Sequence, residues 1–127
     1  INRHRWQESK LLAAIAEKYS HHHQVFNGVK QLLAVRKRQA AFHPNATQFT
    51  LHLGEGLFGF WRQSIDRQQS IFCIYNISSQ PQSLTLADLN LINTQQWYEL
   101  LSKTVLDEEL KTMQVAPYQT LWLSNRA

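Results

Sequence analysis

The chain has 127 residues, of which 43% are hydrophobic and 11% aromatic, a composition that excludes a disordered tail and is typical of one domain with its own core. No apolar run approaches the roughly 20 residues that a membrane helix needs. The net charge of +4 is uneven, because residues 1–40 hold eight Lys and Arg against two Glu, whereas residues 41–127 hold five against seven acids.

The sequence begins with Ile1 instead of Met, so we expect it to be a piece of a longer protein. Its single cysteine, Cys73, lies in the apolar run 71–75. A cysteine in such a run usually packs as a small hydrophobe, and we expect a buried thiol. An isolated cysteine also fits a cytoplasmic location.

Two helices are predicted first, over residues 8–19 and 23–40. Apolar side chains recur at helical spacing in both segments. Gly28 costs about 1 kcal/mol relative to Ala inside a helix, which suggests close packing against a neighbour. Pro44 cannot continue the second helix. The apolar residues that one copy of the chain cannot all bury are Leu11, Leu12, Ile15, Val25, Val29 and Leu32. We therefore expect these helices to pack on something outside the chain or to form a homodimer.

After Pro44 the apolar period changes from about 3.6 to 2, which predicts strands. The nearly apolar segment 71–77 is typical of a central strand covered on both faces. About seven short strands are expected in an antiparallel sandwich, over residues 48–53, 57–64, 71–77, 83–86, 97–101, 111–115 and 120–123. The side chains expected to be buried are Phe49, Leu51, Phe60, Ile74, Leu121 and Leu123.

The candidate chemical groups do not form a catalytic or metal-binding motif. Residues 21–23 are consecutive histidines, which on a helix point about 100° apart and cannot all face one metal. Residues 107–109 are neighbouring acids, whereas glycoside cleavage needs two carboxylates from different elements, about 5–10 Å apart. We expect no metal, no cofactor and no catalytic residue within the chain. Asn45 and Asn76 begin glycosylation sequons, which carry little weight in a cytoplasmic chain.

Two non-catalytic binding functions are alternatives. The basic cluster at residues 36–38 would suit nucleic acid, but no stacking aromatics are interleaved with it, and a solvated helix end is favoured. Four tryptophans could form a sugar-stacking platform, as in a carbohydrate-binding β-sandwich module: Trp6, Trp61, Trp97 and Trp122. Core packing is favoured for Trp61 and Trp122, which lie among apolar residues of alternating strands.

Four segments appear in the order found in a known family. They are residues 1–4 (INRH), 25–45, 71–76 and 116–123, and the most specific part is the Leu-x-x-Arg to Ala-Phe-His-Pro stretch. Together they resemble the C-terminal end of sucrose phosphorylase-like enzymes in glycoside hydrolase family 13, within the α-amylase superfamily. The resemblance implies an α+β chain. Residues 1–45 would be the last loop and helices of a (β/α)₈ barrel, and residues 46–127 an antiparallel β-sandwich C-terminal domain.

The resemblance also implies a function for the parent enzyme. Such enzymes are retaining glucosyl-transferring phosphorylases that act on sucrose, sucrose phosphate or a related α-glucoside to give glucose 1-phosphate. Their nucleophilic Asp and acid/base Glu would lie upstream, so this chain alone is expected to be non-catalytic. Asn2, Arg3 and His4 match the late active-site loop, whose Arg contacts glucose or phosphate; a structural salt bridge of Arg3 is the alternative. The implied partners are the α-glucoside and phosphate, with neither nucleic acid nor membrane.

Overall fold

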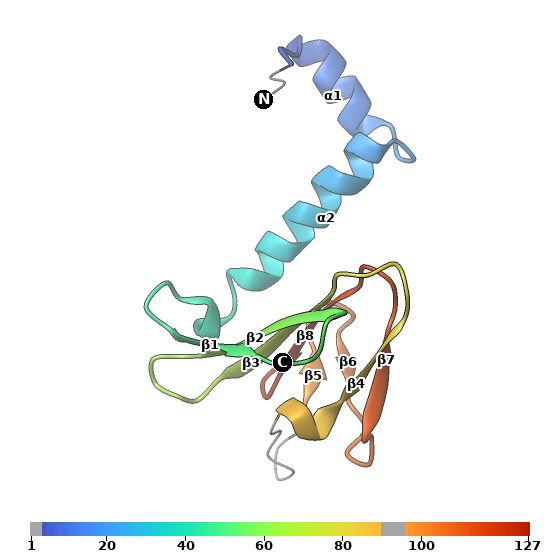
Figure 1. The fold of residues 1–127 in the computed structure, drawn as a ribbon. Helices are drawn as coiled ribbons and strands as arrows, with labels where there is room; N and C mark the ends of the chain where they lie inside the picture. The colour runs from blue at the N-terminus through green and yellow to red at the C-terminus, as the bar shows by residue number, and fades with distance from the viewer. Residues whose placement is uncertain (1–3, 90–95) are drawn as a thin grey trace. The chain divides into compact units, whose positions relative to one another are not determined.

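A computed structural model describes residues 4–89 and 96–127. The chain divides into two compact units, Ile1–Arg36 and Lys37–Ala127. The first unit contains helices and the second contains every described strand, so the predicted α+β class is confirmed (Figure 1). Neither described helix combines the length and hydropathy that crossing a membrane requires.

Both helices are shorter than the sequence predicts. Helix α1 spans Glu8–Ala16 and α2 spans His21–Arg36. Ser20 determines where α2 begins, because its Oγ accepts the backbone N–H of His23 at 3.0 Å, as an N-cap residue does. The same hydroxyl donates to the carbonyl of Ala14 in α1 at 2.6 Å. The capping bond therefore places the histidine run inside the helix, where the sequence predicts a break.

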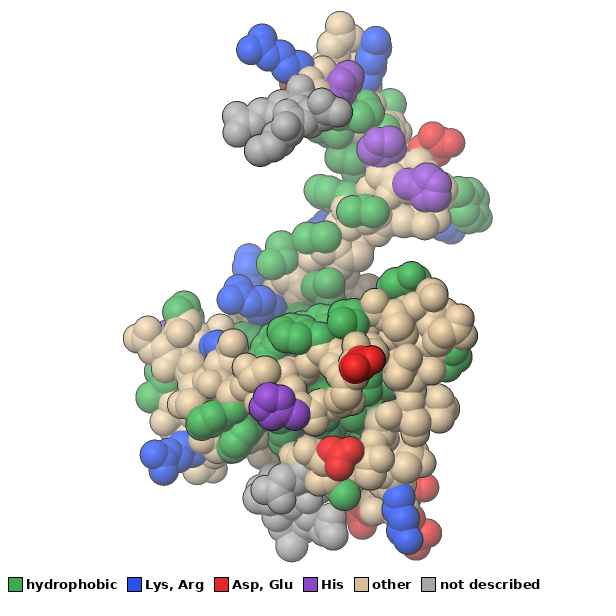
Figure 2. Space-filling model, viewed as in Figure 1, with side chains coloured by type: hydrophobic (Ala, Val, Ile, Leu, Met, Phe, Trp, Pro, Cys, Tyr) green, Lys and Arg blue, Asp and Glu red, His purple; other side chains and the backbone are tan. Residues whose placement is uncertain are grey.

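The apolar faces of the helices remain uncovered. Neither α1 nor α2 has a buried residue, which is in line with the expectation that one copy does not bury all of their apolar side chains. Figure 2 shows hydrophobic side chains exposed along the helical unit. The large exposed ones are Trp6, Leu12, Tyr19, Val25, Phe26, Val29 and Leu33. A Cβ added at Gly28 would meet no atom within 4 Å, so Gly28 has no close neighbour within the described chain.

The second unit is built from two antiparallel sheets (Figure 1). The larger has six strands in the order β1-β2-β3-β8-β5-β6, and the smaller pairs β4 with β7. The strands are β1 (Thr47–Leu51), β2 (Leu57–Gln63), β3 (Ser70–Asn76), β4 (Gln82–Thr85), β5 (Tyr98–Glu99), β6 (Thr104–Val105), β7 (Thr112–Val115) and β8 (Thr120–Ser124). Two 3₁₀ turns complete the unit, η1 (Ala40–Phe42) and η2 (Leu86–Leu89). The predicted strand 97–101 contributes only the two residues of β5.

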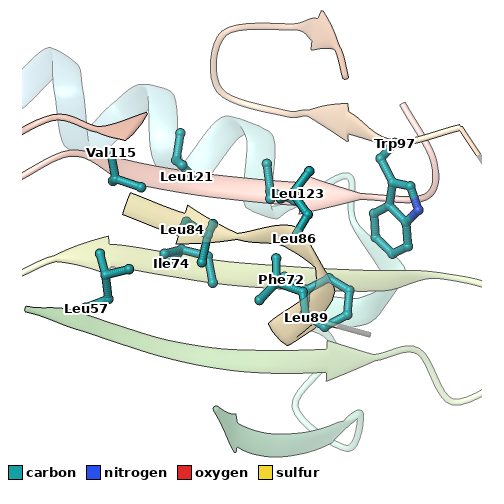
Figure 3. Close-up of a cluster of buried hydrophobic side chains, with 10 residues drawn as sticks. All are labelled: Leu57, Phe72, Ile74, Leu84, Leu86, Leu89, Trp97, Val115, Leu121 and Leu123. Carbon is teal, nitrogen blue, oxygen red and sulfur yellow. The ribbon is translucent and has the colours of Figure 1, made fainter. Parts of the chain in front are cut away.

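The core lies between the two sheets. Phe72 and Ile74 of β3 meet Leu84 of β4 and Val115 of β7 there (Figure 3). The other members of the cluster are Leu57, Leu86, Leu89, Trp97, Leu121 and Leu123. Strand β3 lies inside the larger sheet, between β2 and β8, so the prediction of a central strand is confirmed.

The predicted burial is correct for the inner strands and wrong at the edge. Ile74, Leu121 and Leu123 are buried, and Leu51 and Phe60 are partly buried. Phe49 is 48% exposed. It lies on β1, which pairs only with β2 and ends the sheet, so only its partner across the strands, Trp61, stacks on it at 5.0 Å between ring centroids.

Cys73 lies in the middle of β3 and is fully buried, as predicted. Its registered neighbours are Phe60 on β2 and Trp122 on β8. Burial raises the pKa of the Cys73 thiol to about 12. Since the thiolate is the reactive form of cysteine, this position is inert in the folded chain.

We predict that truncating Leu123 and Phe49, which both lie in strands of alternating apolar residues, lowers the free energy of unfolding by different amounts. Leu123→Ala should lower the free energy of unfolding by about 2–5 kcal/mol, because it opens a cavity in the core. Phe49→Ala should cost about 1 kcal/mol, the value of an exposed aromatic pair. Urea unfolding of both variants measures this difference. Equal losses would contradict the assignment of β1 to the exposed edge.

We also predict that Cys73 reacts with a thiol reagent only after unfolding. At pH 8, roughly one folded molecule in ten thousand carries the thiolate, against about a quarter of free cysteines. The labelling rate should therefore follow the unfolding rate as urea is raised, with the Leu123→Ala variant labelling faster. Rapid labelling in buffer without urea would show that β3 is accessible.

Candidate functional site

Of the three predicted substrate-binding residues, the structure describes only His4; Asn2 and Arg3 lie outside the described residues. His4 is exposed, and its ring meets that of Trp6 at 5.1 Å between centroids and 84° between planes. The Trp6 ring meets that of His22, at the start of α2, at 5.2 Å and 77°. Perpendicular contacts of this kind are a favourable aromatic geometry. We call these three residues the ring cluster.

The three consecutive histidines have different surroundings, as a helical rotation of about 100° per residue requires. His21 is exposed, and His22 belongs to the ring cluster. His23 Nδ1 lies 2.7 Å from the carbonyl oxygen of Ile15 in α1. Within residues 4–89 and 96–127, no three His, Cys, Asp or Glu side chains gather as metal ligands would.

Acidic side chains at two places in the second unit accept backbone hydrogen bonds. Residues 107–109 form an exposed turn in which the first carboxylate accepts the backbone N–H of the third at 2.9 Å. Glu99 is buried, and its carboxylate accepts backbone N–H groups of Trp122 at 3.0 Å and Leu101 at 3.2 Å. No signal in the sequence marks Glu99 as a buried acid. Hydrogen bonds of this kind satisfy a buried carboxylate and tie β5 to β8.

Asp66 organises the turn between β2 and β3. Its Oδ1 accepts the hydroxyl of Ser64 at 2.5 Å and the backbone N–H of Gln68 at 3.1 Å. The hydrogen bond from Ser64, followed by that from Gln68, lowers the pKa of Asp66 below its ordinary value. The carboxylate is thus held ionised in an exposed turn, where it accepts turn hydrogen bonds.

Two side chains, from Arg62 in the larger sheet and from Gln69 just before β3, anchor the segment 41–44. This segment lies in the most specific part of the sequence resemblance. The guanidinium of Arg62 on β2 donates to the carbonyl oxygens of Ala41 at 3.0 Å and His43 at 2.6 Å. Gln69 is buried, and its Oε1 accepts the backbone N–H of Ala41 at 3.0 Å. The segment therefore packs with the β-unit. The sequence gives no sign of these contacts, because the partners are 19 to 28 residues apart in the chain.

Asn76 is a structural residue at the end of β3. It is 3% exposed, and its Nδ2 donates to the carbonyl oxygens of Val115 at 3.0 Å and Ala116 at 2.9 Å. Its Oδ1 accepts the backbone N–H of Ser78 at 2.9 Å. Because both ends of the amide are engaged and buried, the Asn76 sequon cannot accept a glycan in the folded chain.

The tryptophans of the second unit are part of its packing. Trp97 and Trp122 are buried, and the partly buried Trp61 stacks near Phe72 at 5.9 Å. Core packing of Trp61 and Trp122 is thereby confirmed. Trp6 is 43% exposed and belongs to the first unit. These four tryptophans therefore do not form an exposed platform on the sandwich.

The sequence is similar to two curated phosphorylases, although no protein-family model matches it. It is 26% identical over 132 residues to a glucosylglycerate phosphorylase of Spirochaeta thermophila, covering 98% of this chain and 22% of the relative. It is 31% identical over 123 residues to a glucosylglycerate phosphorylase of Allomeiothermus silvanus, covering 97% of this chain and 19% of the relative. The chain thus spans about a fifth of the length of these relatives.

The fold is similar to part of a solved structure, that of AmyP in complex with maltose. The TM-score is 0.67 over 84% of this chain and 21% of that chain, at 14% identity, a likeness that concerns the fold alone. Similarity to sucrose phosphorylase in particular does not follow from these comparisons. Together, the sequence and the fold support a chain that resembles the C-terminal part of a phosphorylase-type enzyme of glycoside hydrolase family 13.

Proposed function

We propose that this chain forms the C-terminal end of a glycoside phosphorylase, which transfers a glucosyl unit from an α-glucoside to phosphate and yields glucose 1-phosphate. The observation that carries the proposal is the similarity of nearly the whole chain to two glucosylglycerate phosphorylases. Glucosylglycerate is therefore the first substrate to consider. Sucrose and sucrose phosphate, which the sequence resemblance implies, are the second.

In this proposal, residues 1–45 are the last loop and helices of a catalytic barrel, and residues 46–127 are the C-terminal domain. The uncovered apolar side chains of α1 and α2 support it, because barrel helices bury such faces against strands. The boundary between the compact units falls between Arg36 and Lys37. Residues 37–45 would therefore be part of the barrel domain as the proposal divides the chain, although they pack with the β-unit. In the chain alone, the same apolar faces would join two copies, which light scattering would detect as a doubled mass.

The chemistry proposed for the whole enzyme divides between this chain and the rest. A carboxylate of the barrel attacks the anomeric carbon, and a second carboxylate protonates the leaving oxygen. A phosphate oxygen then attacks the anomeric carbon, displaces the first carboxylate and gives its proton to the second carboxylate. Within this chain, Asn2, Arg3 and His4 would hold the sugar or the phosphate. Arg3 suits either partner, since a guanidinium presents a fixed fork of donors. The scheme needs no cofactor, because phosphate itself is the acceptor.

We predict that the full-length protein carrying this sequence releases glucose 1-phosphate when it is given phosphate and an α-glucoside. Glucosylglycerate should react faster than sucrose or sucrose phosphate. The 127-residue chain alone should release none, because the two carboxylates of the proposed mechanism would lie in another part of the enzyme, while Glu99 and Asp107 accept backbone hydrogen bonds. A coupled assay for glucose 1-phosphate measures all three substrates. A full-length protein inactive with each of them would refute the proposal.

We predict that Arg3→Ala in the full-length enzyme lowers kcat/KM about 10- to 100-fold, the usual loss for a hydrogen bond to a charged group. Arg3→Lys should recover only part of this, because an ammonium lacks the guanidinium fork. Arg5→Ala is the matched control, since Arg5 is an exposed basic residue two positions further on. If both alanine variants kept wild-type kinetics, the structural alternative for Arg3 would be favoured.

A further inference from the structure

We propose that His22 is a positioning residue for the predicted substrate-binding segment, acting through the ring of Trp6 on His4. The inference rests on the proposed function, because it concerns the side chains that would hold the sugar or phosphate. No motif in the sequence connects His22 with this segment, and the connection comes from the ring contacts alone.

The segment that contains His4 and Trp6 has no regular secondary structure of its own. Residues 4–7 precede α1, and Gln7 is still extended, with φ −74° and ψ 133°. The first helical hydrogen bond runs from the N–H of Leu11 to the carbonyl of Gln7. Two ring contacts therefore hold the segment in place. His4 contacts Trp6, and Trp6 contacts His22.

His22 is a suitable anchor because the start of α2 is fixed to α1. The Ser20 hydroxyl joins the two helices through the carbonyl of Ala14, and His23 joins them through that of Ile15. His22 lies between these two tied residues, and its ring reaches back to Trp6, 16 positions earlier in the chain. A histidine on a fixed helix start thus restrains an extended segment.

Restraint of this kind affects substrate binding more than the chemical step. A segment that is ordered before binding loses less conformational freedom when the substrate arrives. The carboxylates of the proposed mechanism belong to another part of the enzyme, so the ring contact would not alter them. Loss of the His22 ring should therefore raise KM about two- to tenfold, the range expected for freeing one or two side chains, and leave kcat nearly unchanged.

Kinetics of the full-length enzyme test the inference with three variants. His22→Ala removes the ring, His22→Phe keeps a ring that can contact Trp6, and His21→Ala removes an exposed histidine with no ring contact among the described residues. We expect a raised KM for the α-glucoside or phosphate in His22→Ala alone, with recovery in His22→Phe. His22→Ala matching His21→Ala in an active enzyme would overturn this inference and leave the proposed function standing. Inactivity of the wild-type enzyme on every α-glucoside would remove both.

An NMR measurement on the 127-residue chain reports the contact without activity. The indole ring current shifts the carbon-bound ring protons of histidines that lie against it. Trp6→Leu should therefore move the His4 and His22 ring resonances towards their positions in an unfolded chain and leave those of His21 unchanged. Equal changes at all three histidines, or none at His22, would overturn the inference.

Discussion

The burial of strand β3 on both of its faces is the constraint on which the second unit depends. Phe72 and Ile74 face the core between the sheets, while Ile71 and Cys73 are fully buried on the alternate positions. A strand covered in this way must pair on both edges, and it does so with β2 and β8. Polar contacts then complete its two ends, where Ser70 donates its backbone N–H to Asn125 and Asn76 binds the turn before β8. The remaining strands lie around this element.

The first unit lacks any such element. Its two helices are joined by hydrogen bonds at one end, from Ser20 and His23 to carbonyl groups of α1, and they bury no side chain completely. Large contiguous apolar surface on a soluble monomer is unusual and generally marks a contact with something else. The proposed barrel would supply such a contact, because its strands would bury the apolar faces of α1 and α2. It also fits the described structure around His4, where ring contacts with Trp6 and His22, rather than complete burial, hold the segment.

The sequence predicted the elements whose signals are local. The period change near Pro44 correctly separates helices from strands, and the apolar run at 71–77 correctly identifies the central strand. Alternation failed at Phe49, because a period of two shows which residues share a face but not whether another layer covers that face. Residues such as Glu99 could not be assigned, since their partners come from distant parts of the chain. The same reason applies to the ring cluster, in which Trp6 and His22 belong to separate segments.

The substrate-binding residues were predicted from the family resemblance. In the structure, one part of that resemblance concerns packing and another part concerns the predicted site. The most specific part of the resemblance includes segment 41–44, where Arg62 and Gln69 hold the backbone of Ala41. In the same segment, the Phe42 ring meets that of Trp122 in a tilted contact, at 4.8 Å between centroids. These are packing contacts, so this part of the resemblance concerns architecture. Choice of substrate would instead depend on the segment around His4 and on residues outside the chain. A protein can therefore share the architecture of a glucosylglycerate phosphorylase while accepting a different α-glucoside, which is why the assay must compare substrates in the whole enzyme.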